Sequence, residues 1–149
     1  MEDVKNYLRQ YVQFLNRELD ALDDIVEFRL SHMGPKAIAY SDMPKGGGGG
    51  DSLAAFVSKL DEKQDKYISL QIRRRNLKCH IEEVLNSGGF SAEERVIIRL
   101  RYLIPVPCVK NNKITHYRHY GWSEIDEIMQ ISQSKSMKLH RKALKKLKK

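Results

Sequence analysis

The sequence predicts an all-α protein in which a long antiparallel, coiled-coil-like helical hairpin precedes a C-terminal helix-turn-helix domain, with a small β-hairpin as an insert. Apolar residues recur every three or four positions over residues 2–33 and again over residues 51–86, which is the period of an amphipathic helix. The chain ends in a lysine-rich stretch with the same period. A content of 31% charged and only 8% aromatic residues also favours long helices over a compact sheet protein.

Residues 2–33 are expected to form the first helix of the hairpin. The apolar residues that occupy its two heptad core positions are Leu8, Val12, Leu15, Leu19, Leu22, Val26 and Met33. A seam this narrow needs a partner helix. Gly34 and Pro35 are expected to end the helix, because glycine suits the position after a C-cap and proline cannot continue the hydrogen-bond ladder.

Residues 34–50 are interpreted as a glycine-rich linker. The five glycines at 46–50 have no side chains to pack and lose the most backbone entropy on ordering. A Walker phosphate-binding loop requires a lysine after its glycines, whereas Asp51 and Ser52 follow here, so no nucleotide site is predicted. Asp51 is expected to cap a second helix that runs to about Asn86 and folds back on the first.

A third helix is expected to begin the C-terminal domain. The sequence Ser-Ala-Glu-Glu at residues 91–94 is a capping box, so the helix should start at Ala92. Pro105 and Pro107 should end it, since proline interrupts helical hydrogen bonding.

A hairpin is the expected structure of the segment that follows. Residues 106–110 and 113–117 can pair around Asn111 and Asn112, which suit a two-residue turn. The composition of this insert suits a wing that contacts a phosphate backbone, and a solvated loop is the alternative. The residues with this composition are Lys110, Lys113, His116, Tyr117, Arg118, His119 and Tyr120.

Residues 122–149 predict two short helices joined by a tight turn. Ser123 is expected to cap the first helix with Asp126 at the reciprocal position, and Ser132 or Ser134 to cap the second. In a helix-turn-helix the second helix enters the major groove of DNA. The residues expected to meet DNA are Gln133, Ser134, Lys135, Lys138, Arg141, Lys142 and Lys145.

The net charge of the chain is concentrated in this second helix. Residues 132–149 hold eight lysines and arginines and no carboxylate, and the whole chain has 27 Lys plus Arg against 19 Asp plus Glu. Those eight cations therefore account for the full net charge of +8. Charge gathered on one element indicates a surface that binds a polyanion, and a solvated lysine-rich helix is the alternative.

Several strings in this part of the chain resemble a known family. Glu-Arg-Val-Ile at 94–97, Leu-Arg-Tyr at 100–102 and Trp-Ser-Glu-Ile at 122–125 resemble region four of bacterial sigma factors. Leu-His-Arg-Lys-Ala-Leu at 139–144 narrows the resemblance to the sigma-like late transcriptional regulators of phages and prophages, of the ArpU and RinA type. The resemblance implies DNA binding by the last helix. The chain departs from the pattern at Asp126, Gln130 and Ser136, where the family has Ala, Gly and Val or Ile, respectively.

The predicted domains are a helical hairpin over residues 1–87 and a DNA-binding domain over residues 90–149. Cys79 and Cys108 lack the spacing of a pair, which indicates a reduced compartment. No apolar stretch approaches the roughly 20 residues of a membrane span. We therefore expect a cytoplasmic protein of a bacterial host cell that does not bind a membrane.

The sequence predicts no catalysis, metal or cofactor. His116 and His119 have the spacing of a zinc-binding pair, but no cysteine pair accompanies them. His32 and His140 are expected at the surface or in a groove. No nucleophile, base and acid in a recognisable order stand out, so the protein is not expected to be an enzyme.

The leading functional hypothesis is a phage-type, sequence-specific transcriptional regulator that binds double-stranded DNA. One alternative is a sigma-like interaction module that contacts the host RNA polymerase. Another is a phage DNA-packaging subunit of the small-terminase type. A homodimer through the helical hairpin is a further expectation.

Overall fold

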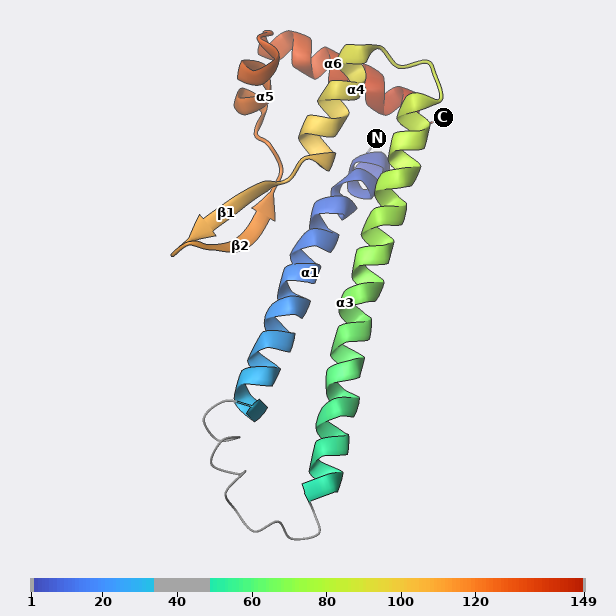
Figure 1. Ribbon diagram of the computed structural model, residues 1–149. Helices are drawn as coiled ribbons and strands as arrows, with labels where there is room; N and C mark the ends of the chain where they lie inside the picture. Colours follow the sequence, from blue (N-terminus) through green and yellow to red (C-terminus); the bar gives the residue numbers. More distant parts are fainter. Residues whose placement is uncertain (1, 34–48, 149) are drawn as a thin grey trace. The chain divides into compact units, whose positions relative to one another are not determined.

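A computed structural model describes residues 2–33 and 49–148 of the chain. Within these residues the chain is mostly helical, with five α-helices, a short π-helix and a two-stranded antiparallel sheet (Figure 1). The predicted predominance of helix and the small sheet among the helices are confirmed. No helix in the described ranges combines the length and the apolarity needed to cross a membrane.

The element boundaries follow the sequence prediction in most places. The α-helix ends at Met33 and Asn86 and the start at Ala92 are confirmed. The elements in chain order are α1 (Glu2–Met33), α3 (Gly49–Asn86), α4 (Ala92–Ile98), the π-helix η1 (Arg99–Leu103), β1 (Val106–Lys110), β2 (Lys113–Arg118), α5 (Trp122–Met129) and α6 (Gln133–Lys148).

The start of α3 differs from the prediction. Gly49 and Gly50, which were expected in the linker, are helical. Glycine disfavours a helix by only about 1 kcal/mol per residue relative to alanine, which does not prevent a helix from starting there. The rest of the expected linker, residues 34–48, lies outside the described residues.

The chain divides into two compact units. One unit combines Met1–Asn16 with Arg73–Lys149, and the other is Arg17–Ile72. The division expected from the sequence lay between residues 87 and 90, so the observed grouping differs from it. The first sixteen residues and the last turns of α3 belong with the C-terminal elements.

The core of the first unit explains this grouping. Leu85 and Leu144 are at most 1% exposed, although one lies in α3 and the other in α6. The buried residues that form this core are Leu8, Tyr11, Val12, Leu77, Ile81, Leu85, Ile98, Tyr102, Leu103, Ala143 and Leu144. The C-terminal elements therefore share their apolar interior with parts of α1 and α3.

The second unit has a smaller interior. Phe28 stacks on Phe56 with ring centroids 5.1 Å apart, and the Lys63 ammonium lies 2.7 Å from the Asp24 carboxylate. The buried side chains described in this unit are Glu18, Ala21, Ile25 and Leu70. Large apolar side chains stay exposed on both of its helices, namely Leu22, Val26, Leu30, Leu53, Val57, Ile68 and Ile72. Two residues of the predicted heptad seam, Leu22 and Val26, are thus at the surface.

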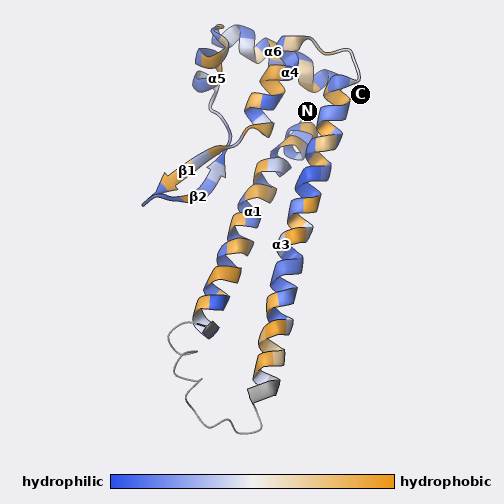
Figure 2. Cartoon of the chain, viewed as in Figure 1, coloured by the Kyte–Doolittle hydropathy of each residue, from blue (hydrophilic) through white to orange (hydrophobic). Residues whose placement is uncertain are grey.

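The predicted β-hairpin forms and is held to α1. Its turn consists of Asn111 and Asn112, which have φ angles of 54° and 60°, a left-handed conformation that asparagine tolerates better than most residues. The side chain of Asn16 accepts a 2.6 Å hydrogen bond from the Tyr117 N–H and donates a 3.0 Å bond to its carbonyl. Figure 2 shows the hairpin tip in the hydrophilic colour. This segment is an ordered hairpin on a fixed stem, and not the loop of the alternative interpretation.

Ile81→Ala tests whether the C-terminal elements depend on α3. Truncating a buried isoleucine is expected to cost about 2–5 kcal/mol in the free energy of unfolding. Trp122 is the only tryptophan of the chain, so its fluorescence reports the urea-induced unfolding of α5. Ile68→Ala, at a side chain 49% exposed on the same helix, is the matched control and should change stability by about 0.5 kcal/mol or less. An unchanged Trp122 transition in Ile81→Ala would contradict the shared core.

Candidate nucleic-acid interface

The surface of α6 displays the residues that the sequence assigned to DNA contact. All seven are exposed, and we call them the outer face of α6: Gln133, Ser134, Lys135, Lys138, Arg141, Lys142 and Lys145. Ser134, Lys138, Arg141 and Lys145 are spaced by four, three and four positions, so they share one side of the helix. The buried residues of α6 lie on the opposite side. Gln133, three positions before Ser136, is on that same side but is exposed in the first turn.

The buried side of α6 differs in part from the sequence prediction. Ala143 is buried as expected, but Leu139 is only half-buried. Ser136 and Ala143 are 0% exposed, Leu144 is 1% exposed and His140 is 7% exposed. The expected position of His140, at the surface or in a groove, is wrong. The sequence did contain a signal for this buried face, because positions 136, 140, 143 and 144 follow the helical period. Two of these residues, Ser136 and His140, are polar, so the apolar pattern was not recognised.

A polar pair of the buried Ser136 and the half-buried Asp126 joins α5 to α6. The Ser136 hydroxyl lies 2.5 Å from Oδ1 of Asp126 and 3.0 Å from the Gln133 carbonyl. These two residues are departures from the sigma-like pattern, and the structure brings them together. The shorter contact makes the carboxylate the main acceptor, and a hydrogen bond to a charged group is stronger than one between neutral groups.

Gln130 lies in the turn between α5 and α6 and is the third residue at which the chain differs from the sigma-like pattern. Gln130 adopts a left-handed conformation with φ 55° and ψ 45°, where glycine carries no steric cost. Its position after Met129 ends α5. Ser132 then starts α6, because its side chain accepts a 3.2 Å hydrogen bond from the Lys135 N–H. Capping by Ser132, one of the two predicted candidates, is confirmed.

The start of α5 was predicted incorrectly. Ser123 does not cap the helix. Gly121 is the N-cap residue, and its N–H donates a 3.0 Å hydrogen bond to the Glu124 carboxylate. Arg118 donates to the same carboxylate at 2.7 and 3.2 Å. The Arg118 guanidinium, together with the Gly121 N–H, lowers the pKa of Glu124 to about 2. Asp126, the expected capping partner, instead serves Ser136.

An ion pair connects α6 to the start of α4. Ser91 caps α4 as predicted, with its hydroxyl accepting a 3.2 Å bond from the Glu94 N–H. The Glu94 carboxylate is 5% exposed and does not complete the capping box. Its oxygens lie 2.9 and 2.8 Å from the Lys146 ammonium. Lys146 is therefore one cation of the terminal helix that has a structural role.

His140 lies among aromatic residues inside the first unit. Its Nε2 is 2.8 Å from the Tyr102 hydroxyl, and Trp122 meets its ring edge-on with centroids 4.7 Å apart. Burial lowers the pKa of His140 to about 4, and the nearby cations Lys5 and Arg101 act in the same direction. Burial also raises the pKa of Tyr102. The Tyr102 hydroxyl and the neutral imidazole thus share one hydrogen bond.

Several residues of the expected wing hold the fold together instead. His119 Nδ1 lies 3.0 Å from the Arg101 carbonyl, and burial lowers its pKa. Arg101 donates to the Tyr120 carbonyl and lies 4.9 Å from the Trp122 ring centroid, a cation–π arrangement. Tyr117 is bound by Asn16 and Arg118 by Glu124. The other exposed polar residues near the hairpin tip are Lys110, Asn111, Asn112, Lys113, Thr115 and His116.

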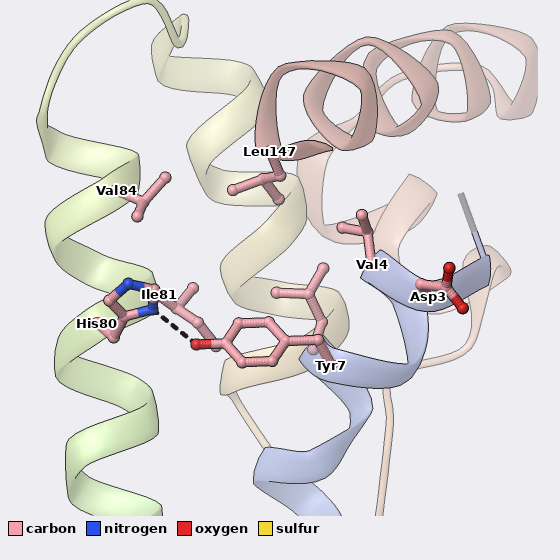
Figure 3. Close-up of a pocket in the computed structure, with 8 residues that line it drawn as sticks. Asp3, Val4, Tyr7, His80, Ile81, Val84 and Leu147 are labelled. Atoms are coloured by element: carbon pink, nitrogen blue, oxygen red, sulfur yellow. Dashed lines mark hydrogen bonds between the residues drawn. The ribbon is translucent and has the colours of Figure 1, made fainter. Parts of the chain in front are cut away.

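A hollow of about 230 Å³ lies between α1, α3 and α6 (Figure 3). Its lining is mainly apolar, and the Tyr7 hydroxyl points to Nδ1 of His80 at 2.6 Å. Asp3 is the carboxylate at its rim. A mainly apolar surface with an acidic residue does not suit a polyanion, so the outer face of α6 is the candidate site.

Comparison with protein-family models, curated proteins and solved structures found no match for this chain. The resemblance to sigma-like regulators therefore stays a prediction from the quoted strings.

The pair formed by Asp126 and Ser136 predicts a coupled effect on stability. Ser136→Val leaves the Asp126 carboxylate without this hydrogen bond and is expected to cost about 1–3 kcal/mol. Asp126→Ala should cost less, because the Ser136 hydroxyl keeps the Gln133 carbonyl as an acceptor. The double variant makes the site apolar and should recover most of this loss. Urea denaturation of the four proteins measures the coupling. Losses that simply add would mean that the two side chains act independently.

His140→Gln predicts a change in the pH dependence of folding. The folded ring, with a pKa of about 4, stays neutral while the unfolded ring takes up a proton below its ordinary value of about 6.5. Stability is therefore complete above about pH 6.5, falls as the pH drops and levels off below about pH 4, for a total of roughly 3 kcal/mol. The glutamine variant should lose less stability than the wild type between pH 7 and 4 in denaturant titrations. Parallel stability–pH curves would refute this role of His140.

Proposed function

We propose that the protein is a phage-type, sequence-specific DNA-binding transcriptional regulator. In this proposal α5 and α6 form a helix-turn-helix, and α6 is the recognition helix that enters the major groove of double-stranded DNA. The observation that carries the proposal is the outer face of α6, which is exposed and cationic while the opposite face is buried.

The residues of the outer face divide into two roles. The first turn of α6 carries Gln133, Ser134 and Lys135, whose side chains suit hydrogen bonds to base edges, since the start of a recognition helix approaches the bases. Lys138 follows one turn later, near bases and phosphates. The remaining cations are expected at phosphates, where they position the helix without reading sequence.

The charge distribution around α6 favours a polyanion over plain solvation. Solvated helical faces commonly mix charges of both signs. In the described part of α6 the charged residues are all cations, and the carboxylates that meet them, Glu93 and Glu94, come from α4. Glu93 lies 3.7 Å from Lys135, where both side chains are about half exposed, so this pair contributes little and can open on binding.

Lys138→Ala combined with Arg141→Ala tests the proposal. About five phosphate contacts would make log K fall with log salt at a slope near −4 to −5, and the double variant should reduce this slope by about 2. Fluorescence anisotropy on a 30-bp duplex of mixed sequence measures both values. The thermal unfolding midpoint of the double variant should equal that of the wild type, because both side chains are exposed.

Lys59→Ala combined with Lys66→Ala is the matched control, since it removes two exposed cations of α3. This control should bind like the wild type. Equal losses in the two double variants, or a wild-type slope near zero, would rule out α6 as the interface. Selection from a random duplex library tests sequence reading separately, and Gln133→Ala should change the selected sequence.

A further inference from the structure

The hairpin tip carries two exposed lysines in a part of the chain that is rich in cations. Between Glu94 and Glu124 the sequence contains no carboxylate, and six cations fall there, namely Arg95, Arg99, Arg101, Lys110, Lys113 and Arg118. Arg99 binds Glu82 at 2.8 Å, Arg101 binds the Tyr120 carbonyl and Arg118 binds Glu124. Those arginines support the fold. Lys110 and Lys113 are exposed at the end of the hairpin.

The local structure of the tip is unfavourable for a hairpin on its own. Lys110 and Lys113 are directly opposite each other in the register, and like charges in that arrangement repel. Asn111 and Asn112 both have positive φ, and the favoured turn of this type has glycine second. Residues that weaken their own element are expected where function requires them.

The tip is also presented on a fixed stem. Asn16 binds the backbone of Tyr117, and the Arg118 guanidinium binds Glu124 at the start of α5. Directly behind the two lysines, Val109 and Ile114 pair across the strands and are 62% and 36% exposed. A surface that only meets water does not require exposed apolar side chains next to cations and amides. This combination of groups therefore indicates a binding surface.

We propose that the tip of the β1–β2 hairpin is a second nucleic-acid contact and enters the minor groove of duplex DNA. The amides of Asn111 and Asn112 donate to the acceptors on the groove floor, adenine N3 and thymine O2. Lys110 and Lys113 reach the phosphates on either side. This inference rests on the proposed function, in which α6 makes the first contact.

The chemistry of the tip matches the minor groove better than the major groove. The minor groove is about 6 Å wide, so it admits a turn but not a helix. Proteins that bind there use lysine and asparagine, often with apolar side chains placed against base steps, a position that Val109 suits. The guanine amino group stands on the groove floor of G·C pairs, so the tip should prefer A·T pairs.

Three alternating polymers separate the two grooves. Poly(dA-dT) and poly(dI-dC) present the same minor-groove groups, whereas poly(dI-dC) and poly(dG-dC) share their major-groove groups, because inosine lacks only the guanine amino group. Lys110→Ala combined with Lys113→Ala should weaken binding about tenfold on the first two polymers and clearly less on poly(dG-dC). Both side chains are exposed, so the Trp122 unfolding transition should change little.

Lys142→Ala combined with Lys145→Ala is the charge-matched control on α6 and should weaken binding to all three polymers equally. If the hairpin variant loses equally on all three polymers, or loses nothing, the minor-groove contact is wrong while the role of α6 stands. If the α6 variant binds all three like the wild type, the proposed function itself falls.

Discussion

The burial of Ala143 and Leu144 decides which side of α6 faces outward. Both side chains enter a core that contains Leu8, Ile81 and Leu85 of the two long helices. Successive residues of a helix point about 100° apart, so a rotation of α6 by one residue would turn part of its cationic outer face toward this core. Burying an unpaired ammonium is far costlier than exposing a leucine. The apolar core and the charged surface therefore select the same orientation.

Polar groups within the first unit add specificity to that orientation. Ser136 has a carboxylate partner in Asp126, and His140 has a hydroxyl partner in Tyr102. A purely apolar interface tolerates small shifts, whereas a buried polar group loses its hydrogen bond when it moves. Asp126 and Ser136 are matched to each other, because the carboxylate accepts from the hydroxyl.

Prediction from sequence succeeded where the cause is local. Helix ends at Met33 and Asn86, the caps Ser91 and Ser132, and the Asn111 turn all depend on residues within a few positions of each other. The exposure of the outer face of α6 also followed from helical periodicity. The predictions for Ser123, Asp126 and His140 were wrong because other residues decide their roles. Gly121 takes the N-cap position in place of Ser123, Asp126 accepts from Ser136, and His140 is bonded to Tyr102, which is distant in the chain.

The sequence alone determined the mostly helical character, the hairpin insert and the concentration of charge in the last helix, since periodicity, turn residues and composition act over short distances. Tertiary structure decided the rest. It joined the first sixteen residues and the end of α3 to the C-terminal elements, gave Glu94 to Lys146 and buried His140 in neutral form. These outcomes depend on which apolar faces meet, and no single helix carries that information because each face can bury itself against more than one partner.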